Sequence, residues 1–166
     1  MRYLVVGSGP AGVSAAEEIR KNDPEGPITM VTADPHPACS PVMLTYWVSG
    51  RHPEESLYFR DAAAWAKDHR VTLRCGEKMT AIDVHRQAVT LSGGAEIAYD
   101  RLLIATGAAP LIPPIPGIRA KGVFAFRTLA DAEGILISRR DLEQVCIMGG
   151  GFIGIKLACH LWERGL

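Results

Sequence analysis

The chain contains 166 residues, of which 48% are hydrophobic, and its 18 Lys and Arg residues balance its 18 Asp and Glu residues. This length suits one complete core, or one domain with part of a second, and the lack of charge runs argues against nucleic acid and anionic lipid and in favour of small ligands. The four cysteines form no C-x-x-C pair and no apolar run approaches the roughly 18 residues of a membrane span, so we expect a cytoplasmic protein without a metal site or a disulfide framework.

The first predicted elements form a unit of strand, glycine turn, helix and strand. Residues 3–6 are apolar and partly β-branched, which is typical of a parallel strand buried on both faces. From Ala11 the apolar positions recur at helical spacing, until turn residues and prolines at 22–27 end the helix. A second strand is predicted over 28–32, and Asp34 follows it.

Residues 35–60, "PHPACSPVMLTYWVSGRHPEESLYFR", are too irregular for a core strand and too apolar for a disordered linker. We interpret them as a long functional loop that contains a helical piece over 42–48. The large side chains of this piece are expected to be ordinary core residues: Leu44, Tyr46 and Trp47. A further helix is predicted over 61–68.

Three short apolar runs separated by polar turns then predict an antiparallel meander, over 71–74, 80–84 and 88–91. One more apolar strand is predicted over 102–105. It ends in a sharp exit at Thr106-Gly107.

The remaining residues are predicted to lead into a second domain. Four prolines precede Gly117, and prolines at this density mark a domain edge. A helix over 129–138 and a strand over 144–148 are predicted beyond them. We therefore expect a first domain, a Pro-rich crossover with a helix, and the start of a second domain, with bounds 1–109, 110–144 and 145–166.

The glycines after the first strand have the spacing G-x-G-x-x-G. A helix N-terminus has unpaired N–H groups and a partial positive charge, so it attracts a phosphate that can come close. Gly7 permits the tight turn, Gly9 lets a pyrophosphate approach the backbone, and Gly12 lets helix and strand pack closely. Asp34 follows at the end of the next strand, where a carboxylate accepts hydrogen bonds from a ribose. These residues predict a dinucleotide site; the alternative is a glycine-rich turn that binds nothing.

The same spacing returns at Gly149, Gly151 and Gly154, again between a predicted strand and a predicted helix. The residue that would read the second ribose is expected beyond Leu166, so the choice between NADH and NADPH stays open. Two dinucleotide motifs in one chain indicate a redox enzyme with two cofactors.

Five segments, in chain order, resemble a known superfamily: "VVGSGPAGVSAA", "YDRLLIATGAAP", "PPIPG", "RTLADA" and "CIMGGGFIGIKLA". They are similar to the two-dinucleotide-binding-domain flavoproteins, the pyridine nucleotide-disulfide oxidoreductase superfamily. The segment "CSPVMLTYWVSG" most resembles the branch of rubredoxin reductases, ferredoxin reductases and the flavin part of NADH-dependent nitrite reductases. The resemblance implies an α/β fold, in which a Rossmann-like FAD-binding domain with an antiparallel β-meander precedes the first strand and helix of a second, truncated, Rossmann-like NAD(P)-binding domain.

The resemblance also implies a function: an FAD-dependent NAD(P)H oxidoreductase that passes hydride from NAD(P)H to FAD and electrons on to an unidentified acceptor. FAD would bind at the first glycine motif and NAD(P)H at the second. The implied FAD residues are Gly7, Gly9, Pro10, Ala11 and Gly12 at the pyrophosphate, Asp34 at the ribose, Met79 at the adenine, and Ser40, Thr106 and Gly107 near the flavin. The implied NAD(P)H residues are Gly149, Gly151, Phe152, Ile153 and Gly154.

Two positions depart from the pattern of the superfamily. Thiol-dependent relatives carry a redox cysteine where this chain has Val42, so Cys39 is out of register and is expected to be an ordinary small residue. Lys156 stands where many relatives have Glu, which leaves the nicotinamide geometry open. The implied chemistry belongs to the cofactors, so no catalytic acid or base is assigned. The five histidines are expected on the surface or in loops: His36, His52, His69, His85 and His160.

A second interpretation is a truncated or partner-dependent FAD-binding subunit or fragment without catalytic activity. Two complete nucleotide domains need roughly 250–300 residues. We therefore expect the 166-residue chain to be inactive alone. The apolar side of its last helix, formed by Ile153, Leu157 and Leu161, is expected to be exposed and to favour a homo-oligomer, a redox partner protein or a partner subunit.

Overall fold

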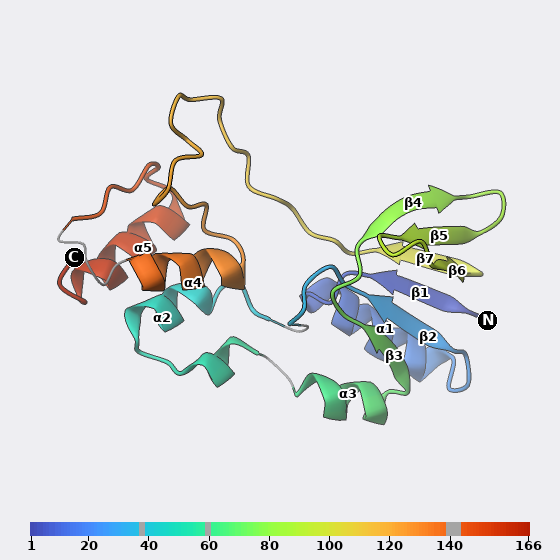
Figure 1. The fold of residues 1–166 in the computed structure, drawn as a ribbon. Coiled ribbons are helices and arrows are strands. Elements are labelled where there is room, and N and C mark those ends of the chain that lie inside the picture. The colour runs from blue at the N-terminus through green and yellow to red at the C-terminus, as the bar shows by residue number, and fades with distance from the viewer. Residues whose placement is uncertain (37–38, 59–60, 139–143) are drawn as a thin grey trace. The chain divides into compact units, whose positions relative to one another are not determined.

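A computed structural model describes residues 1–36, 39–58, 61–138 and 144–166. The chain forms two compact units, and each of them is discontinuous in sequence (Figure 1). The first unit comprises Met1–Cys39 and Tyr58–Gly107, and the second comprises Ser40–Leu57 and Ala108–Leu166. Within the described residues, no helix has the length and apolar character needed to cross a membrane.

The first unit is built on a four-stranded sheet in the order β3-β2-β1-β7, with every neighbouring pair parallel (Figure 1). Its strands are β1 Tyr3–Val6, β2 Ile28–Val31, β3 Val71–Arg74 and β7 Arg101–Ile104. Helix α1, Pro10–Asn22, follows β1, and helix α3, Ala62–Asp68, precedes β3. Parallel neighbours joined through helices are the arrangement of a Rossmann-like fold.

Strand β1 is buried on both faces because its side chains alternate between two core clusters. Val5 packs on one face with residues of α1, β2, α3 and β3: Val13, Ala16, Ile28, Met30, Trp65 and Val71. Leu4 and Val6 pack on the other face with Val31, Val89, Leu91 and Tyr99. The expectation of a strand buried on both sides is therefore confirmed.

A three-stranded antiparallel sheet in the order β4-β5-β6 covers part of the second cluster. Its strands are β4 Met79–Asp83, β5 Ala88–Leu91 and β6 Glu96–Ala98. The expected antiparallel meander was wrong in one of its three strands. Residues 71–74 form β3 of the parallel sheet, and β6 is the third strand of the antiparallel sheet instead. The physical reason is that α3 lies directly before β3, so the chain crosses back and pairs β3 in parallel with β2.

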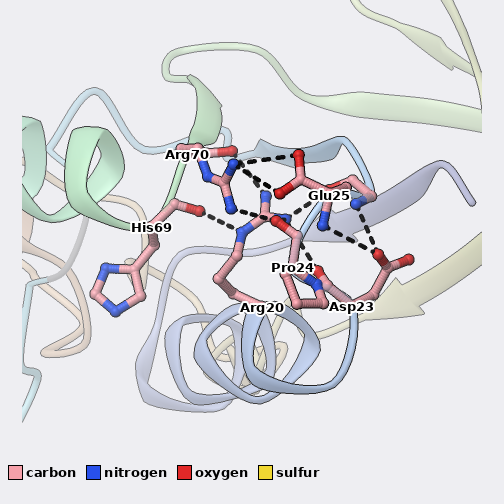
Figure 2. Close-up of polar contacts among 7 residues, drawn as sticks. Arg20, Asp23, Pro24, Glu25, His69 and Arg70 are labelled. Carbon is pink, nitrogen blue, oxygen red and sulfur yellow. Dashed lines mark hydrogen bonds and ion pairs between the residues drawn. The ribbon is translucent and has the colours of Figure 1, made fainter.

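Arg20, near the end of α1, joins the turn after α1 to the turn before β3 (Figure 2). Its guanidinium donates hydrogen bonds to five backbone carbonyls, those of Asp23, Pro24, Gly26, His69 and Arg70, at 2.8–3.1 Å. Arg70 in turn pairs with the carboxylate of Glu25. These contacts lie where β2 and β3 begin, so they fix the amino ends of both strands.

The second unit is helical where its secondary structure is regular. Its elements are α2 Leu44–Ser49, the 3-10 helix η1 Glu54–Leu57, α4 Leu129–Ser138 and α5 Phe152–Trp162. Helix α2 packs against α4 and α5, and Leu44 is buried as expected, whereas Tyr46 and Trp47 are only half-buried. Residues 37–38 and 59–60 of the expected long loop lie outside the described residues.

Three expectations for the second unit were wrong. Residues 144–148 form no strand, because a strand needs hydrogen bonds from a neighbour and the described part of this unit offers none. Leu157 and Leu161 are buried rather than exposed, and only Ile153 of the expected apolar face is open, at 54% exposure. His160 is buried too, and its Nδ1–H is satisfied by donating to the carbonyl oxygen of Thr45 at 2.8 Å.

Candidate functional site

The first glycine loop connects β1 to α1 through backbone contacts that exclude side chains. Gly7 has φ +111°, and a Cβ at this position would lie 2.2 Å from the carbonyl oxygen of Ala105, just after β7. A Cβ on Gly12 would lie 2.0 Å from the carbonyl oxygen of Gly7. Only glycine tolerates these approaches, so the loop brings the carboxyl ends of β1 and β7 to the first turn of α1.

The second glycine of this loop has a different setting. Gly9 is the N-cap of α1 with extended backbone, and no side chain caps the helix there. A Cβ on Gly9 would meet nothing within 4 Å. Open space in front of an uncapped helix N-terminus, whose N–H groups carry partial positive charge, fits a pyrophosphate. Pro10 occupies the first helical position, and Ala11 and Gly12 follow in the same turn.

The second glycine loop repeats this geometry in the second unit. Gly149 has φ +116°, and a Cβ on Gly154 would lie 2.2 Å from the carbonyl oxygen of Gly149. Gly151 is the uncapped N-cap of α5 with extended backbone, as Gly9 is for α1. A Cβ on Gly149 would meet nothing within 4 Å, unlike one on Gly7, because no strand flanks this loop in the described part of the unit. Phe152 and Ile153 are exposed, Phe152 at 96%.

Asp34 lies just beyond the carboxyl end of β2 with its side chain already oriented. Its Oδ1 accepts a hydrogen bond from the N–H of His36 at 2.9 Å, and its own N–H donates to Oγ1 of Thr32 at 3.2 Å. Its Oδ2 makes no hydrogen bond to any residue that the structure describes. One oxygen is therefore fixed by the turn, while the other can accept a ribose hydroxyl.

The other residues expected near FAD are distributed over both units. Thr106 lies beside the first glycine loop, since a Cβ on Gly7 would be 3.1 Å from its backbone nitrogen. Gly107 ends the first unit with φ +70°. Met79 begins β4 and packs against the second core cluster. Ser40 belongs to the second unit, where its N–H donates to the carbonyl oxygen of Leu57 at 2.7 Å.

A family model described as pyridine nucleotide-disulphide oxidoreductase matches residues 1–166 of the chain. The chain belongs to this family. The resemblance that the sequence motifs indicated is therefore confirmed, and the family's cofactors are FAD and NAD(P)H.

Relatives in the family are redox proteins that are longer than this chain. The NADH-dependent phenylglyoxylate dehydrogenase subunit epsilon of Aromatoleum evansii is 38% identical over 164 residues, covering 99% of this chain and 39% of the relative. The rhodocoxin reductase of Rhodococcus erythropolis is 35% identical over 167 residues, covering 100% and 39%. The structure of an NAD-dependent persulfide reductase from A. fulgidus superposes with a TM-score of 0.94 at 35% identity, covering 100% of this chain and 32% of that one. The chain thus spans about two-fifths of the length of these two curated relatives.

The surroundings of Cys39 disfavour the thiolate form of its side chain. It is half-buried and its backbone bridges to Tyr58. Burial raises the pKa of its thiol to about 11, and the negative charge of Asp34 adds to the shift. A thiol with this pKa stays protonated at neutral pH, and the thiolate is the reactive form. This supports the expectation that Cys39 is an ordinary residue, which stays a prediction.

Lys156, the other departure from the family pattern, lies against α2. Its Nζ is 3.7 Å from the centroid of the Tyr46 ring, a cation–π contact. A hydrogen bond with Lys156 and its positive charge lower the pKa of the Tyr46 hydroxyl.

Among the described residues, no group of three or more His, Cys, Asp and Glu side chains could hold a metal ion.

Proposed function

We propose that this chain supplies the FAD site and part of the NAD(P)H site of an FAD-dependent NAD(P)H oxidoreductase. The observation that carries the proposal is the pair of glycine loops, each with one glycine at positive φ, one at an uncapped helix N-terminus and one packed on the loop's own backbone. Family membership supports assigning dinucleotides to both loops.

In the first unit, Gly7, Gly9 and Gly12 shape the loop that receives the FAD pyrophosphate, and the first turn of α1 with Pro10 and Ala11 faces it. Asp34 accepts a ribose hydroxyl through Oδ2, and Met79 lies at the adenine. Thr106 and Gly107, after β7, contribute to the flavin end, and the family resemblance assigns Ser40 to the flavin as well. When bound by these residues, FAD would supply the redox chemistry, which is acceptance of a hydride from NAD(P)H and release of electrons to an acceptor.

In the second unit, the loop of Gly149, Gly151 and Gly154 receives the pyrophosphate of NAD(P)H at the N-terminus of α5. Phe152 and Ile153, in the first turn of α5, lie beside it. We retain 1–109 as the FAD-binding segment, 110–144 as the crossover and 145–166 as the start of the NAD(P)-binding domain.

The electron acceptor is proposed to be a protein. One relative is named as a subunit of an NADH-dependent dehydrogenase and another as a rhodocoxin reductase. We therefore propose a redox partner protein or a partner subunit as the acceptor. We also propose that the protein acts in the cytoplasm and as part of a homo-oligomer.

A second candidate function is an FAD-binding subunit that performs no hydride transfer itself. It is favoured by the lack of a strand beside the second glycine loop in the described residues, where 144–148 have no regular structure.

Anaerobic titration of the full-length protein that contains this chain separates the two candidates. For the oxidoreductase, one equivalent of NADH or NADPH bleaches the flavin absorbance, and a Gly151→Val variant keeps its flavin but is no longer bleached. A protein that carries FAD and is bleached by neither nucleotide is the non-catalytic subunit.

A further inference from the structure

Two charged side chains close the turn between β3 and β4. Nε of Arg74 donates to Oε1 of Glu77 at 2.8 Å, and Nη2 donates to Oε2 at 2.7 Å. Both side chains are about one-third exposed, at 32% and 33%. A bidentate arginine–carboxylate pair fixes geometry as well as charge, so it holds residues 74–77 in one conformation.

Backbone hydrogen bonds join this turn to the loop that carries Asp34. The N–H of Thr32 donates to the carbonyl oxygen of Arg74 at 2.9 Å, and the N–H of Glu77 donates to that of Thr32 at 2.9 Å. The N–H of Gly76 donates to the carbonyl oxygen of Asp34 at 3.2 Å. The two loops therefore form one hydrogen-bonded body at the carboxyl ends of β2 and β3.

The same turn leads directly into β4. The carbonyl oxygen of Lys78 accepts a hydrogen bond from the N–H of Ser92 at 2.8 Å, and Met79 is the first residue of the strand. Asp34 and Met79, the residues proposed at the ribose and the adenine, are thus both connected to residues 74–77.

We propose that Arg74 and Glu77 are positioning residues for the adenosine end of the proposed FAD site, which this inference presupposes. Neither side chain has to touch the nucleotide. The ion pair keeps the turn in the conformation in which Gly76 and Glu77 form hydrogen bonds to the Asp34 loop. Oδ2 of Asp34 and the backbone of Met79 therefore keep their positions relative to one another. Without the pair, the turn populates other conformations, and the apparent affinity for FAD falls with the competent fraction.

The chain contains a matched ion pair that lacks these connections. Arg86 and Glu96 also form two hydrogen bonds, at 3.2 and 3.0 Å, but they join the turn after β4 to β6. Their side chains are more exposed, at 64% and 48%. A substitution there removes the same chemistry without loosening the Asp34 loop.

The test uses the full-length apoprotein, with FAD and FMN as probes, because FMN carries the flavin but no adenosine. Glu77→Gln and Arg74→Gln are each expected to weaken FAD binding about tenfold and leave FMN binding within twofold, so that the ratio of the two affinities falls about tenfold. Glu96→Gln leaves both affinities unchanged. The exchange Arg74→Glu with Glu77→Arg recovers FAD affinity to within about threefold of the wild type.

The unfolding midpoint of each ligand-free variant, measured beside the affinities, separates positioning from general destabilisation. We expect the unfolding midpoint of each variant to be close to that of the wild type. Unchanged FAD affinity in both single variants, or an equal loss of FAD and FMN affinity, would overturn the positioning role. A wild-type protein that binds no FAD would overturn the proposed function and this inference together.

Discussion

Gly12 packs against the carbonyl oxygen of Gly7 so closely that a Cβ on Gly12 would lie 2.0 Å from it. Gly154 stands in the same relation to Gly149, at 2.2 Å. Both helices of the glycine motifs therefore begin in contact with the backbone of their own loop. This contact, rather than any side chain, sets the direction in which each helix N-terminus points.

The first prediction concerns the Gly12 contact. Gly12→Ala is expected to lower the free energy of unfolding of the chain by about 2–3 kcal/mol, because the new methyl group overlaps a backbone atom that cannot move freely. Urea unfolding measures the change. Gly93 is the matched control, since a Cβ there meets nothing within 4 Å, and Gly93→Ala should shift the value by less than about 0.5 kcal/mol. Equal effects of the two substitutions would contradict the close packing.

Asp34 provides the second prediction. Asp34→Ala in the full-length protein is expected to weaken FAD binding about ten- to hundredfold, which is the range for losing a hydrogen bond to a charged group. Fluorescence titration of the apoprotein measures it. Asp68→Ala, at the exposed end of α3, should leave the affinity unchanged. If both variants bind FAD like the wild type, Asp34 does not contact the ribose.

The third prediction addresses the amino ends of β2 and β3. Arg20→Met removes a guanidinium that serves five backbone carbonyls, so we expect the free energy of unfolding to fall by about 2–4 kcal/mol. The neighbouring Lys21 is 72% exposed and pairs only with Glu18 among the described residues, so Lys21→Met should cost less than about 0.5 kcal/mol. A similar loss in both variants would show that Arg20 is not a structural clamp.

Several elements of both units could be predicted because their sequence patterns are local. The apolar run at 3–6 and the helical run at 129–138 have the bounds of β1 and α4. The strand pairing of residues 71–74 could not be predicted from local sequence, because a short apolar run looks the same in a parallel and in an antiparallel sheet. Leu157 and Leu161 are buried in α5, a helix that packs against α2, and α2 lies far away in the sequence.

In the candidate site, too, local features could be predicted and long-range contacts could not. The backbone geometry of both glycine loops could be predicted from spacing, because the constraint lies within six residues. The role of Asp34, inferred from its place after a strand, stays a prediction. The turn at 74–77 was missed. Its contact with the Asp34 loop exists only because β3 pairs with β2, and that pairing was not predicted.

Cys39 carries the fourth prediction. Burial raises the pKa of its thiol to about 11, so the thiol is protonated below that pH and its reactivity grows as the pH approaches 11. In a variant that keeps only Cys39, iodoacetamide should react at pH 8 at least tenfold more slowly than with an unshielded cysteine peptide. Cys39→Ser should retain NAD(P)H-driven reduction of an artificial acceptor. Loss of that activity with FAD still bound would make Cys39 a redox thiol.

The central claim is that the first glycine loop holds FAD, and the flavin content of a Gly9→Val variant tests it most directly. A Cβ on Gly9 meets no protein atom within 4 Å, so the variant should fold, while its side chain fills the space in front of α1. Gly93→Val, equally unhindered, is the control. The account predicts a full-length wild type and Gly93→Val with one flavin per chain, and a colourless Gly9→Val with a native unfolding midpoint. A folded Gly9→Val protein as yellow as the wild type would contradict it.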